Sequence, residues 1–153
     1  MNLELKIPPL LLTIVMIAMM WIAASVVPSL TLSFPGQDIV GLMMIFCGMI
    51  CVGLGVWAFR RVKTTVNPIR PEQASAFVTT GIYAISRNPM YLGFLLILIG
   101  WGVYLGNAVV LLIFPSAFVL YMNRFQIGPE ERALEAIFAD EYVRYRRNVR
   151  RWF

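Results

Sequence analysis

Two groups of polar residues border strongly apolar segments of this sequence, and their side chains are suited to hold a charged small molecule. The first group stands in the stretch GIYAISRNPMYLG, at the start of an apolar run, and consists of Arg87, Asn88, Pro89 and Tyr91. The second group follows the next apolar run and consists of Arg124, Glu130 and Glu131. Guanidinium groups bind anions through paired hydrogen bonds, and carboxylates attract cations. We expect the two groups to meet at one face of a membrane and to form a cofactor site.

The composition indicates a chain that folds in a bilayer. Of its 153 residues, 59% are hydrophobic and 14% are charged, whereas soluble domains carry about 25% charged residues. The net charge of +5 alone would suit a nucleic-acid partner. However, none of the 13 lysines and arginines lies within residues 7–59 or 88–123. This distribution is typical of basic cytoplasmic loops between membrane spans and not of a nucleic-acid groove.

The apolar segments predict a single membrane domain with four spans, because about 20 apolar residues cross a bilayer. The predicted spans cover residues 7–27, 39–59, 89–105 and 108–125. The first segment also has features of a signal peptide, but its apolar core exceeds the ~7–15 residues of such a signal. Arg60 and Arg61 follow the second span, and they predict that its end is cytoplasmic. With four spans, both termini are predicted to be cytoplasmic, as in a protein of a bacterial inner membrane.

The connections between the spans predict which polar residues meet. Only the turn Leu105-Gly106-Asn107 separates the third and fourth spans, so these spans must be antiparallel neighbours. The two polar groups therefore return to the same membrane face. Residues 60–88 contain Pro68 and Pro71, which favour extended geometry before them. Because this segment is also rich in apolar residues, we expect it to pack against the membrane face rather than to span the bilayer.

A stripe of small residues on the second span predicts close contact with another helix. Cys47, Cys51 and Gly55 recur at a spacing of four residues, so they share a helix face. This stripe would also permit a dimer. The two cysteines have no polar partner nearby, and the chain contains no histidine. We therefore interpret the cysteines as packing residues, and we expect no zinc or haem site.

From Pro129 onward, the apolar residues recur with the period of an amphipathic helix. They are Leu134, Ile137, Phe138, Tyr142 and Tyr145. Arginines crowd the far end of this helix, where we interpret them as contacts to anionic lipid headgroups rather than as catalytic groups. The fold class predicted is all-α and integral to the membrane, with four transmembrane helices and a C-terminal amphipathic helix at the interface.

Several functional classes are disfavoured by features that the sequence lacks. It has no glycine-rich phosphate loop after a strand, no Ser/His/Asp set and no cluster of metal ligands. No Asp, Glu, Lys or Arg lies within the predicted spans except Arg124 at the end of the fourth, which argues against a small proton-coupled transporter. The polar groups collect at one interface instead. That arrangement is expected where a water-soluble cofactor must meet a substrate dissolved in lipid.

The order of several short motifs resembles the isoprenylcysteine carboxyl methyltransferase family. These motifs are SRNPMYLG, EERAL, FADEY and VRRW, and the likeness covers roughly residues 64–152. Membrane phospholipid methyltransferases share the Asn-Pro-Met-Tyr element. Two positions depart from the family pattern: Asn88 stands where many eukaryotic members have His, and Phe138-Ala139 stands in place of Phe-Gly.

The resemblance implies S-adenosylmethionine as the methyl donor and a lipophilic small molecule or lipid as the acceptor. It implies segments 64–93 and 124–147 as the parts of the chain that form the cofactor site. The cofactor-binding residues that it implies are Arg87, Asn88, Pro89, Tyr91, Gly93, Glu130, Glu131, Tyr142 and Tyr145. The catalytic candidates are Arg124, which would lie near the reacting groups, and Glu131. The implied partners are membrane lipids and the acceptor, with no nucleic acid and no metal.

Methyl transfer is a direct displacement, so alignment of the reacting atoms supplies most of the catalysis. A carboxylate acceptor needs no general base, and Arg124 could orient it. An amine acceptor must lose a proton, which only Glu or Tyr could take here. An anionic or phenolic acceptor is therefore favoured, and the resemblance implies a carboxylate, as in isoprenylcysteine carboxyl methylation. The alternatives are a phospholipid amine N-methyltransferase and a non-catalytic membrane module that binds or senses a ligand.

Several candidate residues also have a simpler explanation. The two glutamates would complement the dipole at a helix N-terminus, and Arg87 and Arg124 would serve as anchors on the cytoplasmic side. Trp101 and Tyr104 are best explained as packing or interfacial aromatics. The sequence identifies neither the acceptor nor the oligomeric state.

Overall fold

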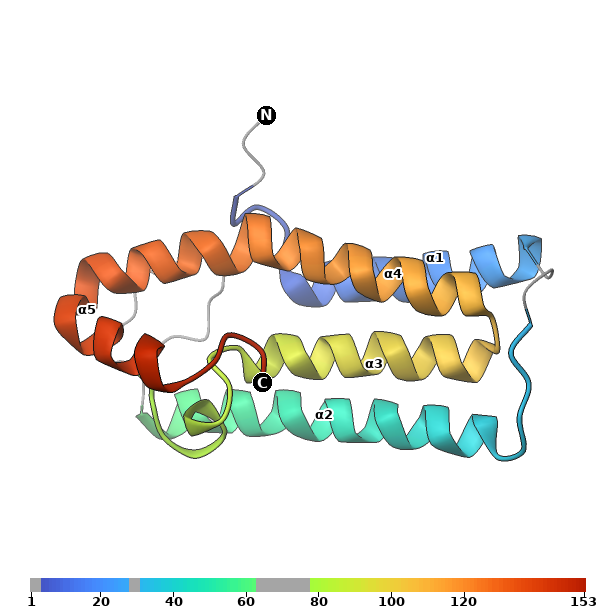
Figure 1. The fold of residues 1–153 in the computed structure, drawn as a ribbon, viewed down its shortest axis with the longest axis horizontal. Coiled ribbons are helices and arrows are strands. Elements are labelled where there is room, and N and C mark those ends of the chain that lie inside the picture. Colours follow the sequence, from blue (N-terminus) through green and yellow to red (C-terminus); the bar gives the residue numbers. More distant parts are fainter. Residues whose placement is uncertain (1–3, 28–30, 63–77) are drawn as a thin grey trace.

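The computed structural model describes residues 4–27, 31–62 and 78–153, and it shows a bundle of long helices (Figure 1). The α-helices are α1 (Pro9–Val26), α2 (Gln37–Val62), α3 (Pro89–Leu105), α4 (Ala108–Tyr121) and α5 (Gly128–Asn148). A 3-10 helix, η3 (Gly81–Ala84), precedes α3, and a π-helix, η4 (Met122–Ile127), joins α4 to α5. α3 is the central element, because it contacts α1, α2 and α4.

The apolar helices are suited to a membrane. α1, α2 and the continuous helix Ala108–Asn148 are each long and apolar enough to cross a bilayer, whereas α3 has 17 residues. Many large hydrophobic side chains on these helices stay exposed, among them Leu10, Trp21, Phe46, Trp57, Leu112 and Leu120. Monomeric proteins in water rarely expose so large a contiguous apolar surface. The protein is an integral membrane protein, and its exact number of spans stays a prediction.

Glycines bring α2 and α3 into close contact. Gly41 and Gly48 of α2 face Gly100 and Gly93 of α3, and a Cβ atom on Gly48 would lie 2.6 Å from the carbonyl oxygen of Gly93. The predicted stripe was only partly right. Gly55 contacts Met90 of α3, but Cys47 is exposed. The contact follows a seven-residue glycine spacing, which keeps these positions on one helix face.

The predicted hairpin between α3 and α4 is present. Gly106 ends α3 in the left-handed conformation, with φ of 62°, which glycine adopts without steric cost. The side chain of Asn107 accepts a hydrogen bond from the backbone N–H of Val110, and it thereby caps α4. The two helices pack against each other. They therefore bring the start of α3 and the end of α4 to the same end of the bundle.

The fourth predicted span and the predicted amphipathic helix form one continuous helical stretch. α4 ends at Tyr121, but η4 carries the helical path into α5 (Figure 1). Its charged residues begin at Arg124, so the apolar part that is suited to span the membrane comes before α5. α5 then kinks at Ala139, whose φ is 41° and ψ is −117°. The chain beyond this kink turns back toward the start of α3.

Part of the predicted cofactor-site segment lies outside the described residues. The structure describes the segment 64–93 only from residue 78 onward. Within that part, Arg87 and Asn88 lie in the connection between η3 and α3, and Pro89 and Tyr91 lie in the first turn of α3.

Candidate functional site

The start of α3 and the start of α5 meet through a pair of buried side chains. The hydroxyl of Tyr91, in the first turn of α3, donates a hydrogen bond of 2.5 Å to Oε1 of Glu130. The side-chain amide of Gln126 donates to the same oxygen at 2.5 Å. Tyr91 and Gln126 are both buried. Residues of the two polar groups therefore lie in contact, whereas their role as a cofactor site at one membrane face stays a prediction.

The surroundings of Glu130 favour its neutral form. Burial raises the pKa of this carboxyl from 4.5 to about 7, and the neighbouring Glu131 adds to the increase. The hydrogen bonds from Tyr91 and Gln126 act in the opposite direction. Both donors are neutral, and Glu130 forms no ion pair with the described residues. A carboxyl near half-protonation at neutral pH is suited to attract a cation or to accept a proton.

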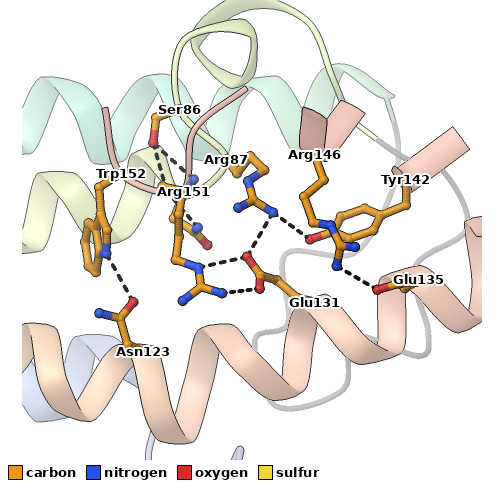
Figure 2. Close-up of polar contacts among 10 residues, drawn as sticks. Ser86, Arg87, Asn123, Glu131, Glu135, Tyr142, Arg146, Arg151 and Trp152 are labelled. Carbon is orange, nitrogen blue, oxygen red and sulfur yellow. Dashed lines mark hydrogen bonds and ion pairs between the residues drawn. The ribbon is translucent and has the colours of Figure 1, made fainter. Parts of the chain in front are cut away.

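Glu131 has the opposite surroundings, since two guanidinium groups hold it (Figure 2). Nη1 of Arg87 lies 3.0 Å from its Oε1. Nε of Arg151 donates to the same oxygen at 3.0 Å, and Nη2 of Arg151 donates to Oε2 at 2.5 Å. The side chains of Arg87 and Glu131 are 11% and 13% exposed. At this burial the two cations compensate the loss of water around the carboxylate.

Arg87 connects this ion pair to the returning part of α5. Its Nη1 donates to the hydroxyl of Tyr142 at 3.3 Å. Burial is the main reason that the pKa of Tyr142 is raised; the charge of Glu131 also raises it, and Arg87 partly opposes the increase. Nε of Arg87 is buried and makes no hydrogen bond with the described residues.

Tyr145 belongs to a neighbouring contact and not to the carboxylate pair. Its hydroxyl donates to the backbone carbonyl of Tyr83 in η3 at 2.7 Å. Burial raises the pKa of Tyr145 well above its ordinary value. This bond fixes the second half of α5 against η3. Tyr145 therefore helps to hold the part of α5 that carries Tyr142.

Segment 149–152, which follows α5, lies across the start of α3. The backbone N–H of Arg87 donates to the carbonyl of Arg150 at 3.0 Å, and Nδ2 of Asn88 donates to the carbonyl of Arg151 at 2.9 Å. Trp152 donates through Nε1 to Oδ1 of Asn123 at 3.1 Å (Figure 2). The interpretation of the C-terminal arginines as lipid contacts is therefore wrong for Arg151, which pairs with Glu131.

Three further predicted site residues have different surroundings. Pro89 is buried at the first position of α3. Gly93 faces Gly48 of α2, so its close approach is to another helix. Arg124 is exposed and forms no ion pair in the parts of the chain that the structure describes, and it does not join the network around Glu131.

Sequence reasoning missed Gln126 and Arg151. Gln126 is a polar residue directly before the apolar Ile127, four positions ahead of Glu130, and that spacing could have suggested a shared helix face. Its burial depends on the π-helix, which widens the turn and has no signal in the sequence. Arg151 stood among several arginines, and its contact arises from the kink at Ala139. Its role could not be read from residue type.

An apolar groove lies between α3 and α4, on the same side of α3 as the site. Its volume is about 430 Å³, and its lining consists of Leu95, Ile99, Pro115, Ser116, Val119 and Leu120. Tyr91, Leu95 and Ile99 are spaced by four residues, so they follow one face of α3. The groove therefore lies along the face of α3 that carries Tyr91 at its start. Among the described residues, no group of three or more His, Cys, Asp or Glu could hold a metal ion.

Comparison with known proteins gives consistent matches. A family model described as phospholipid methyltransferase matches residues 37–141, which contain both polar groups and end before segment 149–152. An uncharacterized protein of Haemophilus influenzae is 51% identical over 63 residues, which make up 41% of this chain and 98% of that protein.

Two named relatives are similar over longer stretches. Protein-S-isoprenylcysteine O-methyltransferase B of Arabidopsis thaliana is 36% identical over 112 residues, or 71% of this chain and 55% of that protein. The protein-S-isoprenylcysteine O-methyltransferase of Schizosaccharomyces pombe is 39% identical over 72 residues, or 47% of this chain and 30% of that protein. The chain thus spans about half the length of the plant relative and less of the yeast one.

Proposed function

Because the chain belongs to the phospholipid methyltransferase family, we propose that it transfers a methyl group from S-adenosylmethionine to a lipophilic acceptor in the membrane. The relatives named above support methyl transfer, and the apolar helices support an acceptor dissolved in lipid. The observation that carries the proposal is Glu130, a partly buried carboxyl that forms no ion pair with the described residues and lies beside a network that already holds Glu131.

The residues of the site suit this cofactor. S-Adenosylmethionine supplies an electrophilic methyl group on a sulfonium cation, and it also carries an ammonium group. Glu130 would attract one of these cations, with Tyr91 and Gln126 holding the carboxyl in place. Asn88, Arg87 and Tyr142 would complete the polar wall on the side of α3. Glu131 would act mainly through its ion pairs, by fixing that wall.

The favoured acceptor is a carboxylate on a lipophilic molecule, because the named relatives are isoprenylcysteine O-methyltransferases. A carboxylate attacks without prior loss of a proton. Arg124 would orient this anion, and its exposed position without an ion pair in the described residues leaves its guanidinium available. The apolar part of the acceptor would lie in the groove between α3 and α4.

A phospholipid amine is the second candidate acceptor, and one observation favours it. An amine must lose a proton to become a nucleophile, and Glu130, with a pKa of about 7, is suited to take it. The two acceptors therefore assign different tasks to the same carboxyl. The site would face the cytoplasm of a bacterial inner membrane, since Arg60 and Arg61 end α2 on the side of the site.

The test begins with the purified protein in detergent, titrated with S-adenosylmethionine. Labelled cofactor is then supplied with a prenylated cysteine or a phospholipid extract, and label is measured in each product. We expect binding, and transfer to the prenylated cysteine. Transfer to phospholipid alone would favour the amine acceptor, binding without transfer to any lipid would favour a sensor, and absence of binding would remove the proposal.

Two matched substitutions locate the site in the same assay. Glu130→Gln removes the charge that would attract the cofactor, and the expected loss of affinity is about tenfold or more. Glu135 lies on the same helix, and Glu135→Gln alters only an exposed ion pair with Arg146. The affinity of this variant for S-adenosylmethionine should therefore match that of the unmodified protein.

A further inference from the structure

Segment 149–152 contacts every element that contributes to the site. Its backbone carbonyls accept hydrogen bonds from the N–H of Arg87 and from Nδ2 of Asn88, at 3.0 and 2.9 Å. Its Trp152 donates to Asn123 in η4. The segment therefore links the start of α3 to η4 at the entrance of α5, although the family match ends before it.

Arg151 contacts two site residues with different parts of its structure. Its carbonyl oxygen holds the side-chain amide of Asn88. Its guanidinium reaches both oxygens of Glu131, with one hydrogen bond to each. This fork fixes the plane of the carboxylate, which a single hydrogen bond cannot do.

We propose that Arg151 is a positioning residue of the cofactor site, which holds Asn88 through its backbone and Glu131 through its guanidinium. The inference rests on the proposed function, since both residues are proposed to belong to the S-adenosylmethionine site. Without the guanidinium, Glu131 would keep only Arg87, which contacts one of its oxygens. The carboxylate would then be free to rotate away, and Arg87 would lose its fixed position against Tyr142.

Arg151 contacts Glu131 with its side chain and Asn88 with its backbone, so a substitution can remove the first contact and keep the second. A side-chain substitution leaves the carbonyl bond to Asn88 and the bond from Trp152 to Asn123 intact. The segment should therefore stay in place, and a space shaped like a guanidinium should open beside Glu131. The Arg151 side chain is 38% exposed, so a small cation from solution can reach that space.

The experiment measures the affinity of Arg151→Ala for S-adenosylmethionine in detergent, with and without guanidinium chloride at non-denaturing concentration. We expect the affinity to fall about tenfold, as for loss of charged hydrogen bonds to a partly buried group. Guanidinium ion should restore part of the loss, and sodium chloride at the same ionic strength should not. Arg146→Ala breaks an exposed ion pair within α5 and should change the affinity less than twofold.

Rescue distinguishes positioning from a purely structural role. In the double variant Arg151→Ala with Glu131→Gln, guanidinium ion should have no effect, because its partner is gone. Unchanged affinity in Arg151→Ala would overturn the inference. A loss of affinity that guanidinium ion does not restore, in a variant with a lower melting temperature, would also overturn it. Failure of the unmodified protein to bind S-adenosylmethionine would instead remove the proposed function and, with it, the basis of this inference.

Discussion

Glu130 and Glu131 are neighbours in the sequence, yet they have different partners. Glu130 accepts hydrogen bonds from the neutral side chains of Tyr91 and Gln126, whereas Glu131 lies between two guanidinium groups. Successive residues on a helix point about 100° apart, so the pair faces two sets of neighbours. Glu130 therefore forms no ion pair with the described residues, whereas Glu131 is held by two guanidinium groups.

The raised pKa of Glu130 predicts how cofactor binding depends on pH. A cation binds the ionised carboxyl, so affinity should rise as the pH increases from about 6 to about 8, through the pKa of about 7. Below that pKa, binding should release a proton, which calorimetry in buffers of different ionisation enthalpy measures. Glu130→Gln should bind weakly, with a flat profile over this range. A flat profile in the unmodified protein would contradict the assignment.

The raised pKa of Glu130 also determines how the stability of the fold changes with pH. The folded protein holds the Glu130 proton more tightly than the unfolded chain, whose carboxyl has its ordinary pKa of 4.5. The stabilisation from this group is therefore fully present below about pH 4.5 and is lost as the pH rises toward about 7. A bound cation would compensate for that loss.

Ala139 predicts a stabilising substitution. Its φ of 41° lies in a region that favours glycine, and a residue with a Cβ atom is strained there by about 1 kcal/mol or more. Ala139→Gly should therefore raise the free energy of unfolding by about 1 kcal/mol, measured by thermal denaturation in detergent. Ala136→Gly, at an exposed helical position of α5, is the control and should lower it by about 0.5–1 kcal/mol. An equal effect of both would exclude strain at Ala139.

At the residue scale, the sequence predicted some residues of the candidate site and missed others. Tyr91 and the acidic pair were found because a polar motif interrupts apolar runs, which is a local signal. Gln126 and Arg151 were missed because Gln126 lies in the irregular turn of η4 and Arg151 reaches Glu131 only after the kink at Ala139. Backbone deviations of this kind are set by tertiary contacts and leave no periodic pattern.

At the element scale, glycines determine how closely α2 and α3 approach. Gly41 and Gly48 contact Gly100 and Gly93 without side chains between the helices, so the two backbones meet directly. Because α3 carries Tyr91 at its start, this contact also fixes the position of the site relative to the bundle.

This contact predicts that a larger residue at Gly48 separates the helices. Gly48→Val places side-chain atoms against the Gly93 carbonyl, and overpacking of this kind costs about 1–3 kcal/mol. Gly53→Val is the matched control in the same helix, since no atom lies within 4 Å of a Cβ built there. Resistance to denaturation by a harsh detergent should fall in the first variant only. A comparable fall in both would mean that loss of glycine, and not contact with α3, is responsible.

The elements themselves were largely predictable. The predicted third span matches α3 at both ends, because Pro89 and Gly106 are strong start and stop signals. The predicted fourth span ended at residue 125, whereas α4 continues without a break through η4 into α5. Composition marks where polarity begins, but it does not mark where a helix ends. The contact face of α2 was assigned to Cys47 because an apolar run has no polar side to orient it.

At the scale of the whole molecule, the polar residues gather at one end of the bundle. The end of α2, the start of α3 and the C terminus lie toward this end, and the turn between α3 and α4 lies at the other (Figure 1). The basic residues Arg60 and Arg61 belong to the first end. This asymmetry predicts an orientation in which the site faces the cytoplasm.

Labelling of single cysteines tests this orientation. In a background with Cys47 and Cys51 replaced by alanine, Ser33→Cys should react in intact cells with a maleimide that does not cross membranes. Phe153→Cys should react only after the cells are opened. Leu32, next to Ser33, donates its N–H to Gly106 in the turn between α3 and α4, whereas Phe153 follows segment 149–152 at the start of α3. Reaction of both positions from outside would contradict the predicted orientation, and so would reaction of neither.

The continuous helical path through α4, η4 and α5 has a mechanical consequence. One rod joins the part of the chain that is surrounded by acyl chains to the carboxyl groups of the site. Helices respond to a thicker or thinner hydrocarbon layer by changing their tilt. A small rotation of this continuous helix would move Glu130. The distance between Glu130 and Tyr91 would then vary with the lipid composition around the protein.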